Sequence, residues 1–102
     1  MITSSESVIC RKAVETFGVE IQQMIAIEEL GELIQAISKR ARWEHDQEGL
    51  EVLSDYIDNL AEEIADVEIM LEQLKHMNGC HIQAEDYKKK KIARLASYIE
   101  GK

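Results

Sequence analysis

The chain has 102 residues, contains no proline and carries a net charge of −8. This length fits one domain, residues 1–102, and the abundance of Ala, Leu, Ile, Glu, Lys and Gln favours an all-α fold. The acidic balance, with a pI near 4.8, argues against nucleic acid or an anionic membrane as a partner, because both would be repelled.

The first expected helix covers residues 4–17. Thr3 and Glu6 have the spacing of a capping box, in which each side chain accepts a hydrogen bond from the backbone N–H of the other residue. Gly18 follows the last apolar position and is predicted to end the helix.

A second, longer helix is expected over residues 19–42 and contains the acidic sequence EELGE at residues 28–32. Glu29 and Glu32 lie along one border of its apolar face. Glu28 lies further round the helix and is predicted to be solvated. The apolar face is formed by Ala26, Ile27, Leu30, Leu33, Ile34 and Ile37.

A polar loop is expected over residues 43–49, which closes with glycine. Trp43, the only tryptophan, could stack on a nucleobase or cover the end of the core, and both interpretations stay open. His45 is expected on the surface. The preceding helix ends in three cations that suit the negative end of its dipole and are expected to be solvated, Lys39, Arg40 and Arg42.

A third helix is expected to start near Glu51, or at an Asp or Ser cap near Ser54, and to run to Met77, where Asn78-Gly79 should end it. Glu63 falls in the middle of its apolar stripe, and Asp66, one turn later, falls at the edge. The stripe comprises Leu53, Tyr56, Leu60, Ile64, Val67, Met70, Leu71 and Leu74. Three other acids are predicted to point away from it, Glu62, Glu68 and Glu72.

After a short link at residues 80–83, a fourth helix is expected over residues 84–99. Four consecutive lysines, residues 88–91, cover all sides of this helix, so one or two should lean inward. Lys91, together with Lys88 and Arg94, is a candidate to contact a phosphate chain. The other two lysines are expected to be solvated.

Four helices, with the second and third long and antiparallel, predict a small four-helix bundle. Face-to-face packing of these two helices would bring Glu29, Glu32, Glu63 and Asp66 into one all-oxygen site. Burying an unpaired carboxylate costs several kcal/mol, and neither acidic cluster has a basic residue on its inward side. Oxygen ligands suit Mg²⁺ or Mn²⁺. The alternative is a glutamate that reaches solvent or faces a subunit boundary.

Other chemistries have less support in the sequence. It has no Gly-rich phosphate loop, no G-x-S-x-G motif, and no Glu-x-x-His pair of the kind that di-iron bundles use. Cys10 and Cys80 are expected to be free thiols, and Cys80-His81 is too short a motif for a zinc site. No apolar run has the length of a signal peptide or a membrane span, so a cytoplasmic protein is expected.

The paired motifs Glu28-Glu29-Leu30-Gly31-Glu32 and Glu63-Ile64-Ala65-Asp66 resemble the E-E-x-x-E and E-x-x-D signature of the MazG-like all-alpha nucleotide pyrophosphohydrolases. The likeness spans residues 18 to about 95. It implies Mg²⁺-dependent hydrolysis of a nucleoside triphosphate between its α and β phosphates, giving a monophosphate and pyrophosphate. It also implies metal binding by Glu29, Glu32, Glu63 and Asp66, and a homodimer or homotetramer.

Two other functions remain as hypotheses. The first is a non-enzymatic helical module that binds a partner, for which removal of the inward charge of Glu63 should stabilise the fold. The second, within the same resemblance, is hydrolysis of phosphoribosyl-ATP. Neither the preferred base and sugar nor the number of metal ions can be read from the sequence.

Overall fold

The computed structural model describes residues 1–43 and 53–102, and in this part of the chain all regular structure is helical. The helices are α1 (Ser4–Phe17), α2 (Val19–Arg42), α3 (Leu53–Asn78) and α4 (His81–Glu100). The predicted all-α, four-helix fold is confirmed. Residues 44–52, which include His45 and most of the expected loop, lie outside the described residues. Among the described helices, none combines the length and apolar character that crossing a bilayer requires.

The start of α1 has the predicted capping box. The backbone N–H of Glu6 donates to Thr3 Oγ1 at 3.2 Å, and the N–H of Thr3 donates to Glu6 Oε1 at 2.8 Å. The helix ends at Gly18, whose φ of +94° favours glycine and allows α2 to begin at the next residue. The predicted limits of α1 and α2 are both confirmed.

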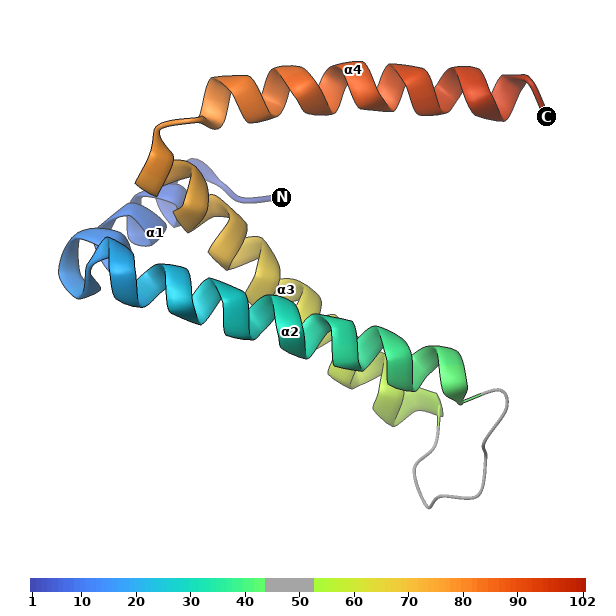
Figure 1. Ribbon diagram of the computed structural model, residues 1–102, viewed down its shortest axis with the longest axis horizontal. Helices are drawn as coiled ribbons and strands as arrows, with labels where there is room; N and C mark the ends of the chain where they lie inside the picture. The colour runs from blue at the N-terminus through green and yellow to red at the C-terminus, as the bar shows by residue number, and fades with distance from the viewer. Residues whose placement is uncertain (44–52) are drawn as a thin grey trace.

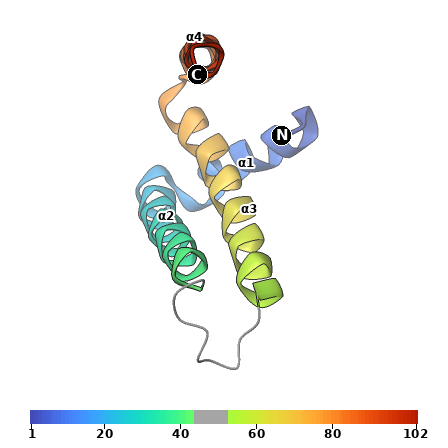
Figure 2. The ribbon, with the colours of Figure 1, turned by 90° about the vertical axis from the view of Figure 1, so that its right-hand side faces the viewer.

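The two long helices, α2 and α3, run antiparallel and side by side, and α1 crosses their far end (Figures 1 and 2). Their contact is built on small and medium side chains, because alanine allows two helix backbones to approach closely. The buried apolar residues are Cys10, Ala26, Ala36, Val67 and Met70. This small core holds the acidic segments of α2 and α3 opposite each other.

The predicted apolar faces are only partly covered. Ile27 and Ile34 on α2 remain 69% and 67% exposed, and Ile64 and Leu71 on α3 are also exposed. A helix that packs against one neighbour buries a single stripe of side chains. In α2 this stripe passes through Ala26 and leaves Ile27 and Ile34 uncovered. One chain therefore leaves apolar surface on both long helices.

The last helix, α4, stands apart from α1 and α2 and contacts α3 alone, near its own start (Figure 1). It begins at His81, earlier than predicted, because Gly79, with φ of +59°, lets the chain turn directly after α3. No residue of α4 is buried. All four lysines are exposed, but Lys88 lines a cavity together with Leu71 and Glu72 of α3, so one of the four faces the neighbouring helix, as expected.

Candidate functional site

The antiparallel pairing of α2 and α3 brings three predicted site residues together. One carboxylate oxygen from each of Glu29, Glu32 and Glu63 lies within 4.8 Å of the others. Glu29 and Glu63 are half-buried, whereas Glu32 is exposed. Two carboxylates thus come from one helix, one turn apart, and the third comes from the opposite helix. We call these three residues the carboxylate cluster.

The hydrogen bonding of this cluster is incomplete. Oε2 of Glu29 and Oε2 of Glu63 are both buried, and neither has a hydrogen-bond partner among the described residues. A buried acceptor without a partner is costly, most of all when it carries charge. These two oxygens are therefore positioned to receive a cation or a proton.

The electrostatics of the cluster lead to the same conclusion. Burial, followed by the negative charge of Glu32, raises the pKa of Glu29 and the pKa of Glu63 above the ordinary carboxyl value. The charge of Asp66 adds to both shifts. Like charges this close favour the protonated form unless a cation neutralises them.

Asp66, the fourth predicted ligand, is half-buried and interacts with Glu29, whose pKa is also raised by a hydrogen bond between the two side chains. It therefore lies beside the carboxylate cluster, although the group within 4.8 Å does not include it. Glu28 and Glu62 are exposed, as predicted. Two immediate sequence neighbours of the cluster thus serve as natural controls for it.

A row of open cavities leads away from the carboxylate cluster between α2 and α3. The first, about 330 Å³, is lined by Glu32 and Glu63 at one end and by Lys39 and Asn59 at the other. The second, about 240 Å³, is lined by Lys39, Asp55, Tyr56 and Asn59. These two cavities share Lys39 and Asn59, so they are neighbours along the helix pair, and we refer to the row of cavities as the groove.

The third cavity, about 260 Å³, is lined by Lys39, Arg42, Trp43 and Tyr56. The groove therefore has carboxylates at one end, a lysine that lines all three cavities, and two aromatic residues at the other end. Such a sequence of groups can hold a cation, then phosphate, then a flat ring. Trp43, a predicted candidate, lies at the aromatic end.

Sequence reasoning missed Lys39, which was expected only to balance the dipole of its helix. Its spacing contains the signal: Lys39 follows Glu32 by seven residues, which is two helical turns and places both on one face. Tyr56 was assigned to the apolar stripe of its helix, and it is half-buried while also lining the groove.

The structure does not bring the predicted cations of α4 to the carboxylate cluster within one chain. Lys88, Lys91 and Arg94 are exposed on a helix that contacts α3 alone, near the start of α4. Lys88 pairs with Glu85 at 3.0 Å on the surface of the same helix. Any role of these three residues in substrate binding would require a second chain.

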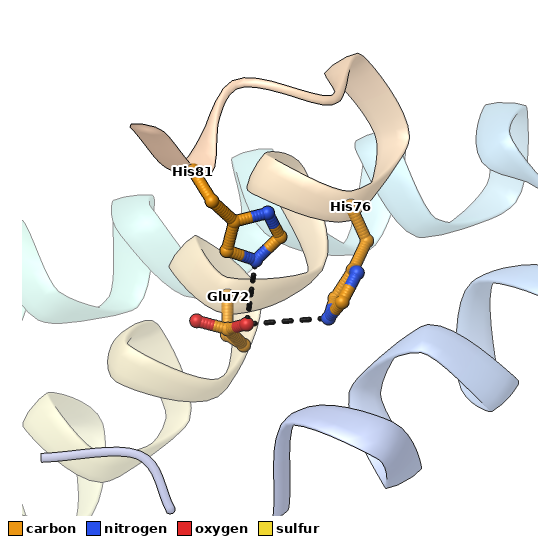
Figure 3. Close-up of side chains that lie close together, drawn as sticks. All are labelled: Glu72, His76 and His81. Atoms are coloured by element: carbon orange, nitrogen blue, oxygen red, sulfur yellow. Dashed lines mark hydrogen bonds and ion pairs between the residues drawn. The ribbon is translucent and has the colours of Figure 1, made fainter. Parts of the chain in front are cut away.

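A second polar cluster lies at the other end of α3, where Glu72, His76 and His81 meet (Figure 3). Glu72 was predicted to point away from the core, and this is wrong: it is only 6% exposed. The reason is α1, which covers this side of α3 and hydrogen-bonds to Glu72 through Ser7 at 2.6 Å. Burial opposes ionisation of Glu72, but the hydrogen bonds from Ser7 and His81 outweigh it and hold the pKa of this carboxyl below its ordinary value.

No family model, curated protein or solved structure matches this chain. Function must therefore be inferred from the carboxylate cluster, the groove and the resemblance of the acidic motifs.

Proposed function

We propose that the protein is a Mg²⁺-dependent nucleoside triphosphate pyrophosphohydrolase of the nucleotide pool in the cytoplasm. One observation carries the proposal: Glu29 and Glu63, on opposite helices, each bury an Oε2 that has no hydrogen-bond partner among the described residues, and their carboxylates lie within 4.8 Å of each other. The likeness of the two acidic motifs to those of the MazG-like enzymes supports the same reaction. The groove toward Trp43 supports a substrate that carries both phosphate and a base.

The donor set fits a hard divalent cation. Glu29, Glu32 and Glu63 offer only carboxylate oxygens, which Mg²⁺ and Mn²⁺ prefer, and Asp66 stands next to Glu29 as a further ligand. When bound, the cation supplies positive charge that neutralises phosphate oxygens and makes nearby water more acidic. Without it, a chain of net charge −8 would repel a nucleotide.

The remaining steps belong to the residues of the chain. A carboxylate oxygen of Glu29 or Glu63 that does not hold the cation accepts a proton from the attacking water. The water oxygen bonds to the α phosphorus, the bond to the bridging oxygen breaks, and pyrophosphate leaves. Lys39 orients the phosphate chain, and Trp43 stacks on the base.

We further propose that the active protein is a homodimer or homotetramer. Six large side chains of α4 are more than half exposed: Ile82, Tyr87, Ile92, Leu95, Tyr98 and Ile99. Three isoleucines of α2 add to this uncovered apolar surface: Ile27, Ile34 and Ile37. Apolar surface on this scale is typical of an interface. A second chain would cover it and could also bring Lys91 and Arg94 to a neighbouring groove.

The same exposed surface favours a second candidate function, a helical module that binds a different protein and performs no catalysis. In that case the carboxylate cluster is only a cost to the fold. Replacing Glu63 by glutamine would then raise stability and remove no activity.

The test is to measure pyrophosphate release from a panel of ribo- and deoxyribonucleoside triphosphates with Mg²⁺, with products assigned by ³¹P NMR. Phosphoribosyl-ATP is included as a separate substrate. Glu63→Gln should lower turnover at least about 100-fold, while its exposed neighbour variant Glu62→Gln keeps it. Equal rates in the two variants, or no release from any substrate by folded protein, would reject the proposed activity.

A further inference from the structure

The cluster where α3 meets α4 combines the buried carboxylate of Glu72 with two half-buried imidazoles, those of His76 and His81. Glu72 and His76 lie in the last turns of α3, and His81 is the first residue of α4. Figure 3 shows both imidazole rings directed at one oxygen of Glu72. That oxygen, Oε2, is 2.7 Å from His81 Nε2 and 3.2 Å from His76 Nε2.

Three polar side-chain atoms surround Glu72 Oε2 at 2.6–3.2 Å. The hydroxyl of Ser7 also donates to Glu72 Oε2, at 2.6 Å, while Ser7 Oγ lies 2.9 Å from His76 Nε2. Ser7 has one hydroxyl proton, so both imidazoles must carry a proton on Nε2 for every contact to be a hydrogen bond. Three donors then converge on one buried oxygen. A metal ion at the centre would replace these shared protons.

The spacing suits a tetrahedral ion. Zn²⁺ bonds to imidazole nitrogen and carboxylate oxygen at about 2.0–2.1 Å, which places neighbouring ligand atoms about 3.3 Å apart. The His76 Nε2 contact, at 3.2 Å, is already close to this separation, and the His81 Nε2 contact, at 2.7 Å, is about 0.6 Å shorter, so the His81 ring would have to move outward to admit the ion. Two histidines and a glutamate form a known zinc ligand set.

We infer that Glu72 Oε2, His76 Nε2 and His81 Nε2 form a binding site for Zn²⁺, which fixes the start of α4 against α3. The fourth position faces Ser7 of α1 or water. Imidazole ligands favour zinc over Mg²⁺, so this site and the carboxylate cluster differ in metal preference. They are also separate in space, because Glu72 follows Glu63 by nine residues, about 13.5 Å along a helix.

The position of the site gives it a structural consequence. Among the described helices α4 packs only against α3, and none of its residues is buried. A zinc ion bound by His81 together with Glu72 and His76 of α3 would restrict the turn at Gly79 and Cys80. Bound zinc should therefore slow backbone hydrogen exchange in the first turn of α4.

The experiment titrates chelator-treated full-length protein with Zn²⁺ and, separately, with Co²⁺, in excess Mg²⁺ to occupy the carboxylate cluster. We expect one equivalent of Zn²⁺ to bind, and Co²⁺ to give the strong visible absorption of a four-coordinate site. His76→Ala and His81→Ala should each weaken zinc binding at least about 100-fold. The matched control is His45→Ala, which removes the third histidine of the chain and should change nothing.

A measurement on the unmutated protein guards against variants that fail to fold. Zinc should protect His76 and His81, but not His45, from acylation by diethyl pyrocarbonate, as read by peptide mass spectrometry. Protection of that pair supports the site. Equal reactivity of all three histidines with and without zinc, or zinc affinity that is unchanged in both histidine variants, would overturn it.

Discussion

Glu29 on α2 and Glu63 on α3 each bury Oε2 without a hydrogen-bond partner among the described residues, and their carboxylates meet within 4.8 Å, together with that of Glu32. The pairing joins two acidic segments that are 34 residues apart by residue number (63 − 29). Neither helix alone would make a site, because each contributes at most two of the three carboxylates. The antiparallel packing of α2 and α3 brings the three carboxylates together.

We predict that the metal-free protein becomes more stable as the pH falls from 7 toward 5. The pKa values of Glu29 and Glu63 are raised in the folded state, so the stability that these groups contribute is present below the ordinary carboxyl pKa and is lost as the pH rises through the raised values. The melting temperature in a chelating buffer should therefore rise as the pH falls. Glu63→Gln should flatten the dependence, and an identical profile in the variant would contradict the assignment.

A second prediction concerns the buried amide pair, in which Gln22 Nε2 donates to Gln73 Oε1 at 2.7 Å. Gln22→Ala should lower the free energy of unfolding by about 1–3 kcal/mol, because Gln73 keeps a buried acceptor that has lost its donor. Changing both residues to Met removes the polar groups together and should cost less than the single change. Urea denaturation of these two variants measures this. A double variant that loses more stability than Gln22→Ala would show that the bond is not the source of the cost.

A third prediction concerns the aromatic end of the groove. Trp43 is the only tryptophan, so its fluorescence reports on this end alone, and a non-hydrolysable nucleotide should quench it in the presence of Mg²⁺. Trp43→Ala should raise KM about tenfold, since loss of stacking on one base costs about 1–3 kcal/mol. Lys39→Gln should also raise KM, whereas Lys12→Gln, an exposed change on α1, should not. Unchanged fluorescence at saturating nucleotide would exclude Trp43 from the site.

A fourth prediction concerns assembly. Ile92→Gln combined with Leu95→Gln removes two exposed apolar side chains of α4 and should shift a dimer or tetramer toward monomer in light scattering. Lys89→Gln with Lys90→Gln alters the polar side of the same helix and should leave the assembly intact. A wild-type protein that is monomeric at high concentration would remove the basis for this prediction.

Much of the fold follows from local signals in the sequence. The Thr3 and Glu6 capping box and Gly18 mark the limits of α1, and the apolar period marks both long helices, because these features act within a few residues. The helix α4 begins earlier than the sequence predicts, because the preceding turn depends on a glycine with positive φ. The spacing of the apolar residues also does not show which half of a broad apolar face a neighbouring helix covers.

Helical periodicity predicts part of the candidate site. The inward positions of Glu29 and Glu63 follow from helical angles, and the structure places these residues together. Glu72 was missed because its burial depends on α1, which is distant in sequence and covers a face with no apolar stripe. The meeting of His81 with His76 likewise depends on the tight turn between α3 and α4, which residue spacing alone does not predict.

The measurement that tests the central claim most directly is Mn²⁺ binding, followed by electron paramagnetic resonance of the free ion and by competition with Mg²⁺. Wild type and Glu62→Gln should bind Mn²⁺ equally and release it to Mg²⁺, while Glu63→Gln should bind at least about tenfold more weakly. Equal binding by the two variants would contradict a cation site at Glu29, Glu32 and Glu63. The proposed hydrolysis would then lose its physical basis.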